Sequence, residues 1–158
     1  MKTDEARLWM SYAKSDLDAA YALLEKGDFF PRQICFLAQQ AGEKALKAIL
    51  IFLEANFPKI HDLDRLRELI PEGWVVKVKF PELYDLSVWA VEARYPAHTP
   101  EVVEHEARET LRRLFSTPCL LSWKSEFKKQ IKNKFHARDY SWLNTSAFRK
   151  FQNTLGRK

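Results

Sequence analysis

Apolar residues recur at intervals of three and four positions along most of the first 115 residues, a spacing that predicts amphipathic helices. The first predicted helix runs from about Asp4 to Lys26, with Thr3 as its N-cap and Gly27 as its stop. Asp16 falls on or beside its apolar stripe, where a carboxylate needs a polar partner. The stripe itself comprises Trp9, Tyr12, Ala13, Leu17, Ala20 and Leu24.

The second predicted helix runs from about Pro31 to Ala55, because proline suits a first helical turn and no further breaker occurs before Pro58. Small residues, Gly42 among them, would let another helix approach closely, so we expect this to be the central helix. Its predicted buried side comprises Ile34, Leu37, Ala38, Ala41, Ala45, Ile49 and Phe52.

A shorter helix should begin near Asp62 and end before Pro71. The segment that follows, WVVKVKF at residues 74–80, alternates apolar and polar residues as a strand does. No other segment is predicted to pair with it, so we expect an extended connection. The apolar positions of the short helix are Leu63, Leu66, Leu69 and Ile70.

Two more helices are predicted before residue 116. One runs from Pro81 to about Tyr95, and the next has Thr99 as its N-cap and Pro100 at its first position. These elements together predict an all-α fold, an up-and-down bundle of four or five helices over residues 1–115.

The net charge of +5 is unevenly distributed. Residues 1–115 contain 16 Lys and Arg against 19 Asp and Glu, whereas residues 116–158 contain ten against two. We therefore expect a basic C-terminal extension at residues 116–158. Such an extension can bind phosphate without sequence preference, although weakly patterned basic termini are more often simply solvated or disordered.

The cysteines and the hydropathy of the chain indicate in which cellular compartment the protein is expected. Cys35 and Cys119 are far apart and belong to no metal-binding pattern, which argues against a zinc site and a disulfide framework. The opening MKTDEARLW is too charged for a signal peptide, and the longest apolar run, AILIFL, is too short to span a membrane. We expect a cytoplasmic protein without a membrane segment, metal or cofactor.

Three polar residues of the second predicted helix could bind an anion. Gln40, Lys44 and Lys47 lie at i, i+4 and i+7, so that one amide and two ammonium groups project from one face. The alternative is a solvated flank in which Glu43 pairs with Lys47. Asp16 is a candidate partner for Lys44, either in a buried ion pair or in a polar site.

A second candidate site is the segment EARYPAH, which contains Arg94 and His98. His98 could take the proton of a ribose 2′-hydroxyl or protonate the leaving oxygen while Arg94 stabilises the phosphorane. The two would then cleave RNA without a metal. The alternative is an arginine that caps helix carbonyls and an exposed loop histidine.

His61 stands at a helix start beside Asp62, which we expect to cap that helix, so a structural role is predicted for this histidine. Several enzyme motifs are absent from the sequence: a Gly-rich phosphate loop, His-Glu-x-x-His, a nucleophile elbow and a paired Glu-x-x-His di-iron pattern.

Four segments, taken in order, resemble the HEPN domain, a nucleotide-binding bundle named for its occurrence in higher eukaryotes and prokaryotes. They are YAKSDLDAAYALLEKGDF, CFLAQQAGEKALKAIL, KIHDLDRL and VEARYP, and the resemblance covers about residues 7–115. The resemblance implies a homodimeric helical bundle that is often encoded beside a small nucleotidyltransferase. Many relatives are ribonuclease toxins or their inactive cousins.

Catalytic HEPN members have an Arg-x(4–6)-His motif, and no arginine here precedes a histidine at that interval. Arg94 and His98 have only three residues between them. The chain is therefore more similar to the nucleotide-binding branch.

Our leading hypothesis is a nucleotide- or RNA-binding subunit that partners a small nucleotidyltransferase, as in a toxin–antitoxin pair. The alternatives are an RNase that uses Arg94 and His98, and a non-catalytic helical adaptor. The predicted nucleotide contacts are Gln40, Lys44, Lys47, Arg94 and Tyr95, with Asp16 and His61 as supporting polar residues.

Overall fold

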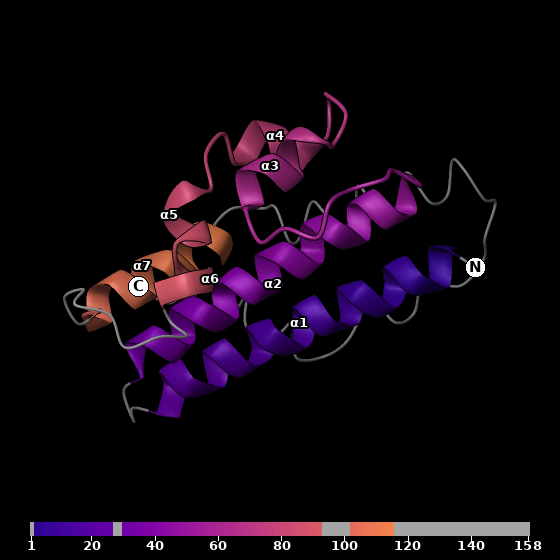
Figure 1. Cartoon of the computed structure of the whole chain (residues 1–158). Coiled ribbons are helices and arrows are strands. Elements are labelled where there is room, and N and C mark those ends of the chain that lie inside the picture. Colours follow the sequence, from indigo (N-terminus) through magenta and orange to yellow (C-terminus); the bar gives the residue numbers. More distant parts are fainter. Residues whose placement is uncertain (1, 27–29, 93–101, 116–158) are drawn as a thin grey trace. The chain divides into compact units, whose positions relative to one another are not determined.

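The computed structural model describes residues 2–26, 30–92 and 102–115, which belong to one compact unit, Met1–Cys119. This part of the chain is helical and contains no strand, so the predicted all-α class is confirmed (Figure 1). The predicted extension at residues 116–158 lies outside the described residues. The helices are α1 (Lys2–Lys26), α2 (Pro31–Phe52), α3 (Leu63–Glu68), α4 (Val75–Lys79), α5 (Tyr84–Ser87), α6 (Trp89–Glu92) and α7 (Glu104–Phe115).

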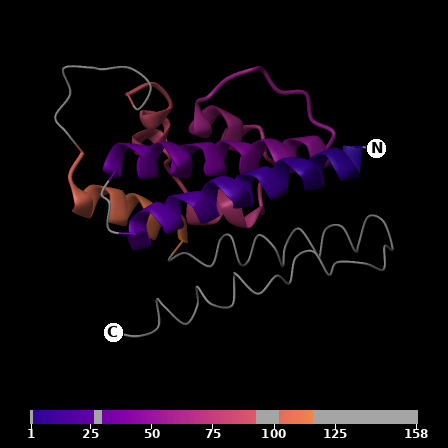
Figure 2. The ribbon, with the colours of Figure 1, turned by 90° about the horizontal axis from the view of Figure 1, so that it is seen from below.

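The frame of the fold is an antiparallel pair formed by α1 and α2, which lie side by side over most of their lengths (Figures 1 and 2). Ala6, Ala13 and Ala20 recur every seventh residue on α1 and are all buried. Their small side chains let α2 approach closely, and Ala38 and Ala41 do the same from the other helix.

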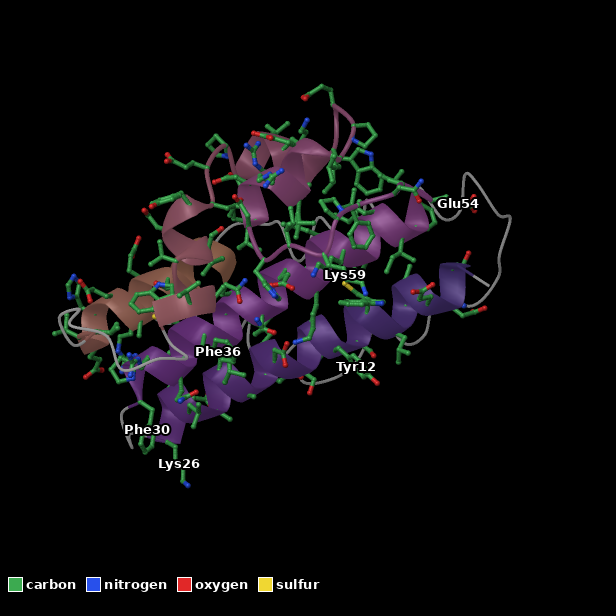
Figure 3. The ribbon with its side chains drawn as sticks, in the orientation of Figure 1. Tyr12, Lys26, Phe30, Phe36, Glu54 and Lys59 are labelled. Carbon is green, nitrogen blue, oxygen red and sulfur yellow. The ribbon has the colours of Figure 1, made fainter. Side chains whose placement is uncertain are left out.

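Two details of α1 differ from the prediction. The helix already includes Lys2, so Thr3 lies within it and is not its N-cap. Tyr12, which was predicted to belong to the apolar stripe, is 54% exposed and points away from α2 (Figure 3). The buried side of the helix is centred on Ala13, the next residue, whose side chain points in a different direction around the helix axis.

Helix α2 begins at Pro31 as predicted but ends at Phe52, three residues early. Glu54 has φ 59°, and its amide donates to the Ile51 carbonyl while the Ala55 amide donates to the Leu50 carbonyl. This is a Schellman motif, in which the left-handed position is usually glycine. The tight reversal explains why the helix stops before Ala55.

Helix α3 is capped as predicted, because the Asp62 carboxylate accepts the Arg65 amide at 3.0 Å. The extended connection predicted for residues 74–80 is wrong, since Val75–Lys79 form α4. The described part of the chain offers no strand to pair with it, so the backbone satisfies its amides locally, as when Lys77 N–H donates to the Trp74 carbonyl.

The helix predicted from Pro81 to Tyr95 is also wrong within the described residues, because α5 starts at Tyr84 and a turn at Val88 separates it from α6. Contacts from α3 explain the late start. The Asp64 carboxylate accepts the Leu83 amide at 3.0 and 3.1 Å, and the Ser87 hydroxyl accepts the Leu63 amide at 3.0 Å.

Helix α7 begins at Glu104, and Val103 precedes its first turn. The predicted N-cap Thr99 and first position Pro100 lie outside the described residues. The Val103 amide donates to Glu106 Oε2 at 3.2 Å, and its carbonyl accepts the Glu106 amide. Helix α7 packs against α2 through buried Ala107 and Leu111. Among the described residues, no helix is long and apolar enough to cross a membrane.

Replacing Glu54 with glycine should stabilise the protein by about 1 kcal/mol, because the left-handed conformation strains a residue with a Cβ atom. Chemical denaturation followed by circular dichroism would measure the change. Glu54→Ala is the matched control: it removes the carboxylate but keeps the Cβ, so it should not give this gain.

Candidate functional site

The polar centre of the structure is the Glu43 carboxylate, which belongs to a residue only 5% exposed on α2. Gln39 and Lys47, one turn before and one turn after it, are also buried, so these three residues share one side of the helix. A buried carboxylate is unfavourable unless it is paired and hydrogen-bonded. The surroundings of Glu43 meet that need.

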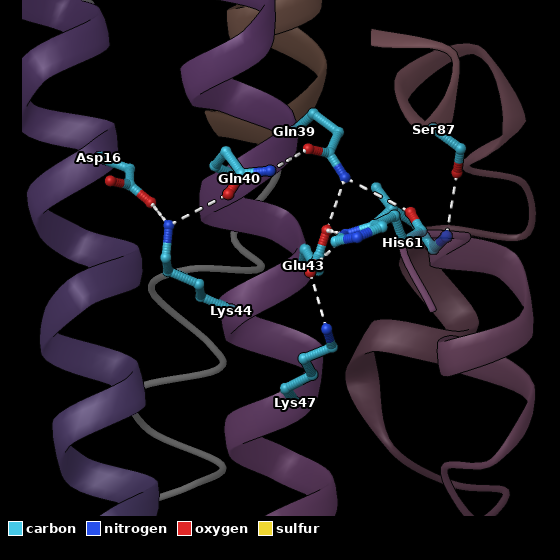
Figure 4. Close-up of polar contacts among 9 residues, drawn as sticks. Asp16, Gln39, Gln40, Glu43, Lys44, Lys47, His61 and Ser87 are labelled. Atoms are coloured by element: carbon cyan, nitrogen blue, oxygen red, sulfur yellow. Dashed lines mark hydrogen bonds and ion pairs between the residues drawn. The ribbon is translucent and has the colours of Figure 1, made fainter. Parts of the chain in front are cut away.

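Three side chains contact the Glu43 carboxylate (Figure 4). Lys47 Nζ donates to Oε1 at 2.7 Å, Gln39 Nε2 donates to Oε2 at 3.0 Å, and His61 Nδ1 lies 3.1 and 3.0 Å from the two oxygens. Burial by itself raises the pKa of Glu43, but the hydrogen bonds from Lys47, Gln39 and His61 outweigh it and lower that pKa. Glu43 is therefore ionised at neutral pH.

His61 occupies the loop before α3, and its side chain is 55% exposed. An ionised carboxylate can only accept, so the proton between the two groups belongs to His61 Nδ1. The His61 carbonyl also accepts Gln39 Nε2, at 3.4 Å. The loop is thus held to α2 at two points, while the other ring nitrogen, Nε2, has no hydrogen bond within the described part of the chain.

A second ion pair joins α1 to α2: Lys44 Nζ donates to Asp16 Oδ2 and, at 3.3 Å, to Gln40 Oε1. The two clusters are connected, because Gln40 Nε2 donates to Gln39 Oε1 at 2.7 Å. We call the connected set the α2 polar network; its members are Asp16, Gln39, Gln40, Glu43, Lys44, Lys47 and His61 (Figure 4).

The two lysines of the network differ in their surroundings. The Lys44 side chain is 23% exposed and its partner Asp16 is similarly accessible, whereas Lys47 and Glu43 are both buried. Lys47 Nζ also lies 5.9 Å from the centre of the Trp9 ring on α1, within the range of a cation–π contact. Lys47 is therefore enclosed by protein, and Lys44 is the ammonium group that solvent reaches.

Most of the polar residues that the sequence singled out belong to this network. The structure brings Gln40, Lys44, Lys47, Asp16 and His61 into one network, and the Asp16–Lys44 pair considered from the sequence is present. The predicted pairing of Lys47 with a glutamate one turn earlier is also present, but it is buried and not on a solvated flank.

Arg94, Tyr95 and His98 lie outside the described residues, so their part in a site stays a prediction. Sequence reasoning missed Gln39 as a member of the network. The spacing of Gln39, Glu43 and Lys47 at successive turns was the available signal. In the described part of the chain, no group of three His, Cys, Asp or Glu side chains is arranged to hold a metal ion.

Comparison with protein-family models matches residues 6–117 to the HEPN domain. Searches of curated proteins and of solved structures found no significant match. The matched range includes every member of the α2 polar network.

Glu43→Gln should lower the free energy of unfolding at pH 7 by about 3 kcal/mol, because it leaves the buried Lys47 ammonium without its counter-charge. The folded-state pKa of Glu43 lies below its ordinary value of 4.5, so the carboxylate stabilises the fold above pH 4.5 and loses that effect as the pH falls through the lowered pKa. Urea titrations across this range should show the difference between variant and wild type shrinking in acid.

The control for this experiment is Glu72→Gln, which removes an exposed glutamate paired with Lys77 and should cost less than about 1 kcal/mol. Adding Lys47→Met to Glu43→Gln should restore part of the lost stability, since no buried charge then remains unpaired. Equal effects of Glu43→Gln and Glu72→Gln would contradict the central place of the buried pair.

Proposed function

The chain belongs to the HEPN domain family, and from that premise we propose that it binds the phosphate groups of nucleotides or RNA at the α2 polar network. The observation that carries the proposal is the solvent-accessible Lys44 ammonium, held between Asp16 and Gln40 at the edge of the network. An ammonium fixed in this way can donate a further hydrogen bond to a phosphate oxygen.

The charges of the network support a binding site of modest strength. The charges of Lys44 and Lys47 are matched by those of Asp16 and Glu43, so the two ion pairs carry no net charge. Lys47 is enclosed and serves to hold the Glu43 carboxylate. Lys44 and the exposed His61 ring are then the groups that contact the ligand.

Family membership supports the wider part of the proposal. We infer that Arg94 and Tyr95 add further phosphate contacts, and that the protein acts beside a small nucleotidyltransferase in a toxin–antitoxin pair. The support for these contacts and for this partner is the HEPN resemblance of the segment VEARYP and of the α2 motif.

Two substitutions at one ion pair should change nucleotide binding in opposite directions. Asp16→Asn frees the Lys44 ammonium from its counter-charge and should tighten binding, whereas Lys44→Met should weaken it by about tenfold, the factor that corresponds to 1.4 kcal/mol. Isothermal titration calorimetry with ATP and with a short oligoribonucleotide, at two salt concentrations, would measure both effects.

The matched control is Lys14→Met, which breaks an exposed Lys–Asp pair on α1 and should leave the affinity unchanged. Absence of binding by the wild type, alone and with its co-purified partner, would sink the proposal and leave the helical adaptor as the better account.

RNA cleavage is a second candidate function, and the Glu43–His61 pair favours it. Glu43 orients the ring through Nδ1 and leaves Nε2 free to accept a proton. In this scheme Nε2 takes the ribose 2′-hydroxyl proton, the O2′–P bond forms, and the P–O5′ bond breaks as the leaving oxygen takes a proton from water. His61 would then take the role that the sequence suggested for His98.

His61→Asn separates positioning from proton transfer, because its amide can still donate to Glu43 but has no counterpart of Nε2. We expect it to keep the part of oligoribonucleotide binding that Lys44 provides and to lose formation of 2′,3′-cyclic phosphate ends, measured on a labelled substrate. An oligodeoxyribonucleotide, which lacks the 2′-hydroxyl, is the negative control. Cleavage unchanged in His61→Asn but lost in His98→Ala would reassign the base to His98.

A further inference from the structure

Tyr12 is a large aromatic residue that the core does not use. Its side chain is 54% exposed and points away from α2 (Figure 3). The bases of single-stranded nucleic acids stack on exposed aromatic rings of proteins, because every base has a flat π-face. Such a ring can hold a base when a phosphate site lies within reach of it.

The proposed phosphate site begins one helical turn from Tyr12. Asp16 follows Tyr12 by four residues on α1, so their Cβ atoms are about 6 Å apart and Asp16 is turned only about 40° further around the helix axis. Lys44 Nζ donates to Asp16 Oδ2, which holds the ammonium group beside the same stretch of α1. One nucleotide can therefore reach both the Tyr12 ring and the Lys44 ammonium.

The surface around Tyr12 suits an uncharged ring better than a second phosphate. The residues one turn before and after it on α1 are Leu8, Trp9, Ser15 and Asp16. None of these four is positively charged, and Leu8 adds an apolar side chain that is 52% exposed. A phosphate placed there would lose water without gaining a cation, whereas a base would cover its face and keep its polar edge in water.

Building on the phosphate site proposed above, we propose that Tyr12 is the base-stacking residue of that site. The ligand is then a nucleotide unit with its phosphate on Lys44 and its base on the Tyr12 ring. The base lies on the α1 side of the network, because Figure 4 shows Asp16 on α1 and His61 on the far side of α2. Stacking tolerates every base, but the larger purines cover more of the ring than the pyrimidines do.

Isothermal titration calorimetry with matched ligands separates the base contact from the phosphate contact. ATP and inorganic tripolyphosphate both present a chain of three phosphates, but only ATP carries a base. The wild type should bind ATP about tenfold more tightly than tripolyphosphate, which is in the lower part of the range that stacking on an aromatic side chain gives. The affinity for CTP, whose base is smaller, should fall between the two.

Three variants assign these effects to residues. Tyr12→Ala should weaken ATP binding by about tenfold and leave tripolyphosphate binding unchanged, whereas Tyr12→Phe keeps the ring and should bind both ligands as the wild type does. Lys44→Met should weaken the binding of both. Tyr84→Ala, at a tyrosine that is 65% exposed on α5, is the matched control and should change neither affinity. Circular dichroism would verify that the variants remain folded.

A short oligoadenylate distinguishes a free nucleotide from an RNA strand as the source of the base: the ligand that loses affinity in Tyr12→Ala is the one whose base occupies the ring. If ATP and oligoadenylate bind Tyr12→Ala as tightly as the wild type while tripolyphosphate still binds, the base contact is overturned and the phosphate site stands. An equal loss of ATP and tripolyphosphate in Tyr12→Ala would also overturn stacking. A wild type that binds none of the three ligands would overturn the phosphate site, and the base contact with it.

Discussion

The structure depends on how it compensates one buried negative charge. Glu43 sits in the central helix with almost no access to water, and an isolated carboxylate there would cost several kcal/mol. Lys47 and Gln39 come from the same helix, but the third contact, His61, belongs to the loop that leads into α3. The contacts of this charge thus join the loop to α2.

Further polar contacts position the short helices that follow α2 in the chain. His61 is bonded to α2 and lies just before α3 in the chain. The Asp64 carboxylate of α3 in turn accepts the amide of Leu83. The Ser87 hydroxyl closes the connection by accepting the Leu63 amide. The short helices after α2 are therefore positioned by side-chain to backbone hydrogen bonds more than by their length, which is too small for stability in isolation.

The sequence predicted well those features that depend on neighbouring residues. The start of α2 at Pro31 and the Asp62 cap are local effects, and both were correct. The break between α5 and α6 was missed because Asp64, which holds the Leu83 amide, acts from another helix. Alternation at residues 74–80 suggested extended backbone, yet the segment forms a helical turn.

The candidate site was predicted in part for the same reason. The spacing on α2 identified Gln40, Lys44 and Lys47, and the position of Asp16 on α1 suggested its pairing with Lys44. Burial of Gln39 and Glu43 could not be predicted, because it arises only when the His61 loop folds over them.

Gln39 shows how narrowly one position can be constrained. Its oxygen accepts from Gln40, so its nitrogen must face Glu43. The amide therefore joins the Asp16–Lys44 pair to the Glu43–Lys47 pair in one orientation only. Glutamate here would confront a second carboxylate. Methionine would fill the space but would remove the acceptor of the Gln40 amide and the donor to both Glu43 and the His61 carbonyl. The side chain at this position must therefore match both the space available and the positions of the donors and acceptors around it. Among sequences that keep this network, we expect glutamine to be hard to replace.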